Sequence, residues 1–208
     1  MTAQTLLYMD YKSPYAYLAK QPAYDLEAEF GFEFDWRPYT LDIPNYLGSA
    51  RLGDDGAVIE ENRTPHQWRR VRYSYMDVRR HANRQGLTIR GPRKIWDSSL
   101  AQIGMLYAQT QGRDRFRRYN DLVFERFWKR ELDIENADAV LAILEEAGCA
   151  SAGFPGYSEG AGREEHARIL AEAEEMGIFG VPTFVIGGEL FWGREHLESI
   201  RGRLGGSG

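Results

Sequence analysis

The sequence predicts an α/β protein in which two short strand-containing units flank a long helical region. The first forty residues read as a strand, a helix and a second strand, and the chain from residue 183 reads as two strands and a helix. Between these units the apolar residues mostly recur at a helical period. A β-α-β unit and a β-β-α unit separated by helices indicate a thioredoxin-like fold with a large helical domain inserted between its halves.

The N-terminal unit begins with an apolar and aromatic run at residues 5–11, TLLYMDY, which is typical of a buried strand. Ser13-Pro14 follows at once, and these residue types favour the cap and the first position of a helix. Apolar residues then share one helical face as far as Gly31, which predicts the helix end. Because Pro22 interrupts this pattern, we expect a kink or a break there. The alternation in residues 32–36, FEFDW, predicts the second strand.

The middle of the chain predicts two connections and a series of amphipathic helices. Residues 41–57 and 153–162 are rich in residues that favour turns, so both predict connections. Apolar residues recur at helical spacing in five segments. They lie at residues 68–82, from Asp97 or Ser98 to about residue 111, at 116–127, at 137–148 and at about 163–176.

The C-terminal unit contains a strong hairpin signal. Residues 183–186, TFVI, and 189–192, ELFW, are separated only by Gly187-Gly188. An amphipathic stretch after Gly193 predicts the last helix, and residues 205–208, GGSG, predict a flexible tail. We therefore assign residues 1–42 and 178–204 to the thioredoxin-like domain. Residues 43–177 form the predicted helical insertion.

Composition excludes several classes of protein. Of the 208 residues, 43% are hydrophobic and 27% charged, which excludes disorder over the whole chain. No apolar run approaches the roughly 18 residues of a membrane helix, and residues 1–7 show no secretory signal pattern. We therefore expect a cytoplasmic protein without a membrane partner. The single cysteine, Cys149, excludes an intrachain disulfide, and the four histidines show no metal-binding spacing, so no metal is expected.

Charge is distributed unevenly along the chain. The formal net charge is −5, but residues 66–94 contain nine Lys and Arg against one acid, Asp77, a local charge of +8. A local basic surface on an acidic protein suggests a small anionic ligand. The acidic remainder and the lack of an RNA-binding motif argue against nucleic acid as a partner.

Two motifs together resemble a known family. The first is DYKSPYAYLA at residues 10–19, and the second is GVPTF at 180–184, which runs on to GELFWG at 188–193. This combination resembles the 2-hydroxychromene-2-carboxylate isomerases and the related kappa-class glutathione transferases, in the disulfide-oxidoreductase-like thioredoxin superfamily. The order of elements fits over essentially the whole chain. A weaker likeness extends to Tyr73, Asp77, Arg80 and Ala82.

The resemblance implies a catalytic role for Ser13 and glutathione as the cofactor. Redox members of the superfamily begin the first helix with a Cys-x-x-Cys pair, where this chain has Ser13-Pro14-Tyr15-Ala16. Without thiols that site cannot exchange disulfides. A hydroxyl donor at a helix N-terminus would stabilise a bound thiolate and lower the pKa of its thiol. The alternative is that Ser13 serves only as the helix cap.

The resemblance also implies that the Val181-Pro182 bond is cis and that the Val181 backbone pairs with the cysteinyl unit of glutathione. Arg194 and Glu195 open the last helix and are further candidates for binding the cofactor. Family members often have Asp at the place of Glu195. A carboxylate there could hold the γ-glutamyl ammonium, or it could simply complement the helix dipole.

Two further candidates for cofactor binding are Lys12 and Asp97. Lys12 could offset charge near Ser13, although a lysine at a strand end is usually solvated. Asp97 stands where many relatives have Asn, and it could instead be a helix cap. An anion near the thiolate would oppose ionisation of the thiol.

Together these features predict a glutathione-dependent isomerase of aromatic-compound degradation. It would act on an unsaturated aromatic oxo-acid, a small-molecule substrate, by reversible thiolate addition. The alternative is a kappa-like glutathione transferase, which would stop at the adduct of glutathione with the substrate. A redox-inactive thioredoxin-fold protein that binds a peptide at the Val181-Pro182 edge is a third interpretation. The sequence does not determine the oligomeric state, and a homodimer is one of the states left open.

Overall fold

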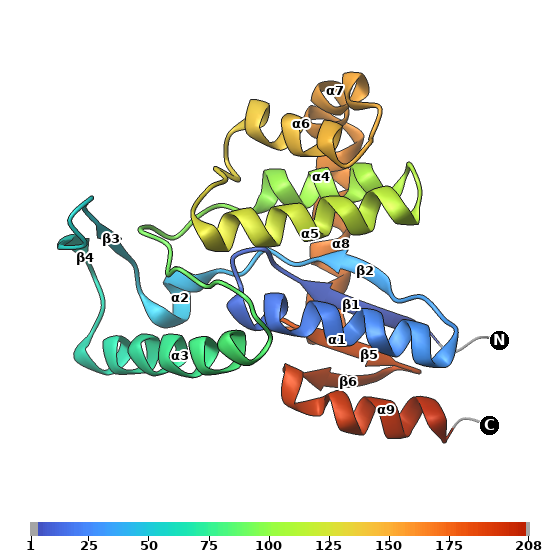
Figure 1. The fold of residues 1–208 in the computed structure, drawn as a ribbon, viewed down its shortest axis with the longest axis horizontal. Helices are drawn as coiled ribbons and strands as arrows, with labels where there is room; N and C mark the ends of the chain where they lie inside the picture. Colours follow the sequence, from blue (N-terminus) through green and yellow to red (C-terminus); the bar gives the residue numbers. More distant parts are fainter. Residues whose placement is uncertain (1–3, 207–208) are drawn as a thin grey trace.

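The computed structural model describes residues 4–206, which form a four-stranded sheet with helices around it (Figure 1). The sheet has the order β2-β1-β5-β6. Its strands are β1 (Thr5–Met9), β2 (Asp35–Pro38), β5 (Thr183–Ile186) and β6 (Glu189–Trp192). β1 is parallel to β2 and antiparallel to β5, and β5 is antiparallel to β6. The two ends of the chain therefore build one sheet.

Helices occupy most of the rest of the chain. α1 (Pro14–Phe30) connects β1 to β2, and α9 (Leu197–Gly205) follows β6. The segment between β2 and β5 supplies the remaining elements. They are α2 (Ile43–Leu47), β3 (Ala50–Leu52), β4 (Val58–Glu61), α3 (Pro65–Arg84), α4 (Ser99–Gln109), α5 (Arg113–Lys129), α6 (Ala137–Glu146), η1 (Ser151–Gly153), α7 (Phe154–Glu159) and α8 (Ala161–Glu175).

This arrangement confirms the predicted thioredoxin-like fold with a large helical insertion. β5 is buried at every position and β1 at all but Thr5, as expected of the two central strands. In Figure 1 α4 and α5 lie above the sheet, while α3 and the β3–β4 hairpin project to one side. The division of the chain at residues 42 and 178 stays a prediction. None of the helices within residues 4–206 is both long and apolar enough to cross a membrane.

Helix α1 runs through Pro22 as one helix, so there is no break there, and the kink stays a prediction. A proline inside a helix removes the N–H that would bond to the carbonyl four residues earlier, here that of Leu18. The side-chain amide of Gln85, at the end of α3, donates to the Leu18 carbonyl at 3.4 Å. This tertiary hydrogen bond partly replaces the missing helical one.

Both predicted connections contain regular structure. Residues 41–57 hold α2, which Asp42 caps, and β3, which pairs with β4. All four residues of β4 are exposed, and this strand has no alternation of apolar and polar residues that the sequence could reveal. Residues 153–162 contain the six-residue α7. Short elements with few buried residues give weak periodic signals.

The second strand and the C-terminal tail begin later in the chain than the sequence predicts. β2 begins at Asp35 rather than Phe32, because its pairing with β1 starts at Asp35, opposite Leu6. α9 includes Gly205, the first residue of the predicted tail. Residues 207–208 of that tail lie outside the described part of the chain.

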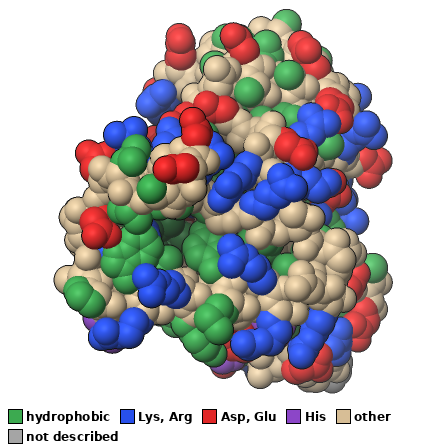
Figure 2. Space-filling view, turned by 60° about the vertical axis from the view of Figure 1, so that its left-hand side comes forward, with side chains coloured by type: hydrophobic (Ala, Val, Ile, Leu, Met, Phe, Trp, Pro, Cys, Tyr) green, Lys and Arg blue, Asp and Glu red, His purple; other side chains and the backbone are tan. Residues whose placement is uncertain are grey.

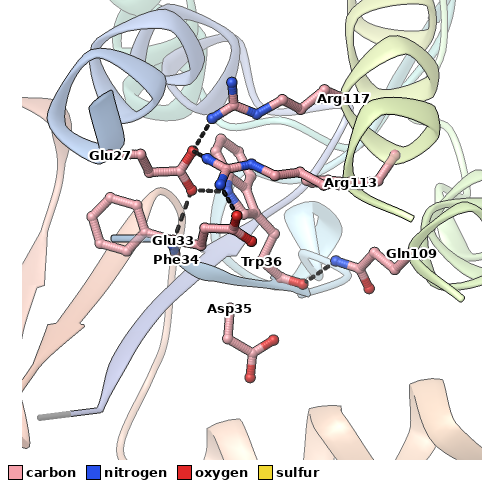
Figure 3. A pocket seen from close by; sticks show the side chains of 9 residues that line it. Glu27, Glu33, Phe34, Asp35, Trp36, Gln109, Arg113 and Arg117 are labelled. Carbon is pink, nitrogen blue, oxygen red and sulfur yellow. Dashed lines mark hydrogen bonds and ion pairs between the residues drawn. The ribbon is translucent and has the colours of Figure 1, made fainter. Parts of the chain in front are cut away.

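A buried carboxylate joins the C-terminal half of α1 to β2 and α5 (Figure 3). Glu27 is 3% exposed, and its Oε1 accepts from the Phe34 N–H at 2.9 Å and from Trp36 Nε1 at 3.0 Å. Its Oε2 pairs with Arg113 at 3.0 Å and with Arg117. These groups also line a surface pocket. The pocket lies about 20 Å from the start of α1, given 1.5 Å per helical residue, so it is remote from Ser13.

Replacing Glu27 should therefore destabilise the fold. Glu27→Gln keeps an acceptor for Trp36 but removes the charge opposite two arginines. We expect a loss of about 2 kcal/mol in the free energy of unfolding, less than for fully buried pairs because the arginines are one-third exposed. Chemical denaturation measures this loss. The exposed acid Glu29, paired with Arg201, is the control, and Glu29→Gln should cost less than about 0.5 kcal/mol. Equal losses would contradict the interpretation.

Candidate active site

Ser13 lies at the N-terminus of α1, just beyond the carboxyl end of β1. Its backbone is extended, with φ −90° and ψ 114°, and its hydroxyl accepts the Ala16 N–H at 3.2 Å. Ser13 is therefore the helix cap that the sequence predicts, with Pro14 as the first helical residue. The side chain is nearly buried, at 4% exposure. Capping uses a lone pair of the hydroxyl and leaves its proton available to a second group.

The second group is the carbonyl of Val181, which comes from the other end of the chain. The Val181-Pro182 bond is cis, as the resemblance implied. Ser13 Oγ donates to the Val181 oxygen at 3.4 Å, a long hydrogen bond. The Val181 N–H has no acceptor within residues 4–206. The structure thus brings Ser13, Val181 and Pro182 together.

Arg194 and Glu195 are held next to this pair. The N–H of Gly193, just before them, donates to the Pro182 carbonyl at 2.9 Å, which ties the end of β6 to the cis proline. Gly193 has φ 104°, and a Cβ added there would lie 2.4 Å from Glu195 Oε2. The Glu195 carboxylate therefore lies over Gly193, in space that only glycine leaves free.

Lys12 directly precedes Ser13, and its charge acts on Asp97. Lys12 Nζ is 3.6 Å from Oδ2 of the fully buried Asp10, which also accepts the backbone N–H of Lys12 at 3.1 Å and that of Leu41 at 2.8 Å. Burial raises the pKa of Asp10, and Lys12 opposes this rise. Asp97 accepts the Ser99 N–H at 2.9 Å at the start of α4. Cofactor binding by Lys12 or Asp97 stays a prediction.

Hydrogen bonds from Ser99 and nearby positive charge favour the ionised form of Asp97. Burial raises the pKa of Asp97, but hydrogen bonds from Ser99 and the charge of Lys12 outweigh it, so the pKa is lower than usual. Asp97 therefore remains an anion at neutral pH. A thiolate placed close to it would be repelled.

Sequence reasoning missed two polar groupings around the site. One is Asp10, which was part of the first motif but received no role. The other links α1 to α3: the Tyr15 hydroxyl donates to Asp77 Oδ2 at 3.2 Å, and Asp77 also pairs with Arg80 at 3.3 Å. Burial, reinforced by Asp77, raises the pKa of Tyr15 to about 12. The only signal in the sequence for this link between α1 and α3 was the weak family resemblance at Asp77 and Arg80.

The face of the molecule on the side of α3 is hollowed (Figure 2). Hydrophobic side chains border the hollow, and Lys and Arg side chains gather around it. No cluster of three or more His, Cys, Asp or Glu suited to a metal ion occurs in the described part of the chain.

A family model described as a DSBA-like thioredoxin domain matches residues 5–205. The chain belongs to this family. Its site nevertheless lacks the thiols of a disulfide oxidoreductase, because Ser13 and Ala16 occupy the Cys-x-x-Cys positions. The single cysteine, Cys149, is buried after α6, and burial raises the pKa of its thiol. Disulfide exchange at the start of α1 is therefore excluded by the residues themselves.

Two curated relatives are similar over almost the full chain. A protein named 2-hydroxychromene-2-carboxylate isomerase from Sphingobium xenophagum is 23% identical over 98% of this chain and 99% of its own length. A protein of the same name from Pseudomonas putida is 26% identical over 95% of this chain and 93% of its own length.

Solved structures share the fold at lower identity. A 2-hydroxychromene-2-carboxylate isomerase superposes with a TM-score of 0.72 at 22% identity, covering 97% of this chain and 94% of the other. A probable DsbA oxidoreductase from Streptomyces coelicolor gives 0.76 at 16% identity, with coverages of 99% and 91%. A cytosolic disulfide reductase from Pseudomonas aeruginosa, solved with GSH, gives 0.63 at 16% identity, with 97% of each chain covered.

The capping role of Ser13 can be measured separately from any catalytic role. Ser13→Ala should lower the free energy of unfolding by about 1 kcal/mol, whereas Ser13→Gly should cost only a few tenths, because glycine is itself a tolerated cap. Denaturant titrations of both variants measure the difference. Equal costs would show that the hydrogen bond to Ala16 does not stabilise α1.

The raised pKa of Asp10 makes stability depend on pH. Between the unfolded and the higher folded pKa, the native state holds more protons, so the contribution of Asp10 to stability falls as pH rises. Denaturation of the wild type and of Asp10→Asn at a series of pH values isolates this contribution. We expect the wild-type stability relative to the variant to decrease with rising pH from about pH 4. An increase over that range would contradict burial as the dominant effect.

Proposed function

We propose that this protein is a glutathione-dependent isomerase of the 2-hydroxychromene-2-carboxylate isomerase type. The observation that carries the proposal is the position of the Ser13 hydroxyl, at a helix N-terminus and against the carbonyl of the cis Val181-Pro182 peptide. The names of the two curated relatives support the isomerase class. The substrate would be an unsaturated aromatic oxo-acid.

The residues around Ser13 suit a thiol tripeptide. The unbonded N–H of Val181 and its weakly bonded carbonyl offer one donor and one acceptor side by side. An extended cysteinyl unit could pair with both, as an added strand pairs with a sheet edge. Ser13 would then turn its proton from the Val181 oxygen, 3.4 Å away, to the sulfur. The rearrangement costs little, because a hydrogen bond of that length is weak.

Each residue near the sulfur has a separate task. Ser13 donates a charge-assisted hydrogen bond to the thiolate, and the first N–H groups of α1 contribute their partial positive charge. Arg194 and Glu195, which follow the Gly193 N–H bonded to Pro182, would contact the charged γ-glutamyl end. Bound glutathione supplies the nucleophile that adds to an electrophilic carbon and leaves again after bond rotation.

Lys12 and Asp97 fit the tripeptide less well. Lys12 is already next to the buried Asp10, and Asp97 is engaged at the start of α4. A transferase would use the same Ser13 site but release the adduct as product.

Calorimetric titration with glutathione tests the proposal directly. We expect saturable binding that weakens when Val181 is replaced by Pro, which removes the N–H offered to the cysteinyl unit. Absence of binding at several millimolar glutathione would contradict the proposal and favour a thioredoxin-fold peptide binder. Product analysis after turnover of an oxo-acid distinguishes an isomer from a glutathione adduct.

The Ser13 hydroxyl should control the ionisation of bound glutathione. A charge-assisted hydrogen bond is worth roughly 1.5–3 kcal/mol, so its loss should raise the pKa of the bound thiol by about one to two units. Ultraviolet thiolate absorbance across a pH titration measures this shift. Ser13→Ala and Ser13→Gly both lose the hydroxyl, so both should lose at least about tenfold in activity at neutral pH.

The glycine variant is the matched control for stability. It keeps most of the cap energy, so its loss of activity cannot come from unfolding of α1. Near-normal glutathione-dependent turnover by Ser13→Gly would show that the hydroxyl is not catalytic.

A further inference from the structure

Arg79 and Arg130 lie near Tyr75, and Arg90 lies near Arg130. Arg79 and Tyr75 belong to α3, and the Arg79 guanidinium lies 5.6 Å from the centre of the Tyr75 ring. Arg130 immediately follows α5, and Arg90 lies in the segment between α3 and α4. None of Arg79, Arg90 and Arg130 forms an ion pair with any acid among residues 4–206.

The backbone at Gly91 brings Arg130 to the hydroxyl end of Tyr75. A Cβ added to Gly91 would lie 3.4 Å from Tyr75 Cε1 and 3.5 Å from Cζ, so this backbone packs against the phenol. The Gly91 carbonyl accepts from Arg130 Nε at 2.8 Å and also from its terminal nitrogen. The Gly91 backbone therefore contacts the Tyr75 ring and also binds the Arg130 guanidinium.

Arg90 completes the group from the same segment. Its guanidinium donates to the Lys129 carbonyl at 3.4 Å, directly before Arg130 in the chain. Arg90 and Arg130 thus use some of their donors on backbone oxygens, which hold them in place. Each guanidinium has five N–H donors, so several remain for a ligand.

Electrostatic effects agree with this geometry. Burial lowers the pKa of Arg130, and the neighbouring charges of Arg93 and Arg90 lower it further. Burial raises the pKa of Tyr75 to about 12, while Arg63, Arg79 and Arg130 oppose the rise. The Tyr75 hydroxyl itself forms no hydrogen bond within the described residues. The unpaired charges of Arg79 and Arg130 thus lie near the Tyr75 hydroxyl, whereas Arg93, also near Arg130, is paired with Asp54.

We propose that Tyr75, Arg79, Arg90 and Arg130 form a binding site for a small molecule with two or more negative charges. Guanidinium groups recognise carboxylate and phosphate oxygens through paired hydrogen bonds, so either chemistry suits the site. Three guanidinium groups without carboxylates favour a multiply charged anion over a single carboxylate. Figure 2 shows Lys and Arg side chains gathered on the face on the side of α3. The site does not depend on the proposed isomerase activity.

Binding of citrate to the full chain at low ionic strength tests this site, measured by calorimetry. Arg79→Gln should weaken citrate binding about fivefold, the effect of losing about 1 kcal/mol from a solvated charge pair. Tyr75→Phe should weaken it less, because it removes only a neutral donor. Arg70→Gln is the matched control, an exposed arginine of the same helix with no contact to Tyr75, and should leave the affinity within about twofold.

Further probes identify the charge and the place of binding. Pyrophosphate should compete with citrate, and acetate should not, because acetate carries a single charge. Ser13→Ala should leave citrate affinity unchanged, since Ser13 belongs to the other site. Equal weakening by Arg70→Gln and Arg79→Gln would show unspecific attraction and overturn the proposal. Loss of citrate binding in Ser13→Ala, or no binding by the wild type at about 10 mM, would also overturn it.

Discussion

The antiparallel pairing of β1 with β5 is the constraint on which the candidate site depends. Its register places Tyr8 opposite Thr183, so the residues that follow β1 lie beside those that precede β5. Ser13 and Val181 are 168 residues apart in the chain, yet this register brings a side-chain hydroxyl of one within hydrogen-bonding distance of the carbonyl of the other. A shift of the pairing by one residue would turn every side chain of β1 to the opposite face and separate the two groups.

Helix α1 has two ends with different electrostatic roles. Its N-terminus carries uncompensated N–H groups and the Ser13 hydroxyl, which suit an anion. Near its other end, Glu27 joins β2 and α5 through two arginines, an indole and a backbone N–H. The Glu27 cluster keeps the helix in place over the sheet, and the N-terminus is left for chemistry. The pocket beside Glu27 therefore belongs to the structural end of α1.

The family provides a scaffold that is independent of redox chemistry. The chain has a DSBA-like thioredoxin domain, and the start of its first helix presents the hydroxyl of Ser13. A hydroxyl is a poor nucleophile at neutral pH but a good donor to an anion. The same helix dipole that would activate a protein thiol can therefore act on a thiol brought by a ligand.

The sequence by itself determined the fold class, the cap at Ser13 and the hairpin of β5 and β6, because these depend on local residue preferences and short periodic patterns. It could not show α2 or the β3–β4 hairpin, whose exposed residues lack periodicity, or the continuous path of α1 through Pro22, which Gln85 from α3 supports. The resemblance anticipated the cis bond at Pro182, but local preference favours trans. Only the tertiary structure decided that the Asp10 carboxylate beside Lys12 also binds the Leu41 N–H and that Arg130 lies near Tyr75, because such contacts join residues far apart in the chain.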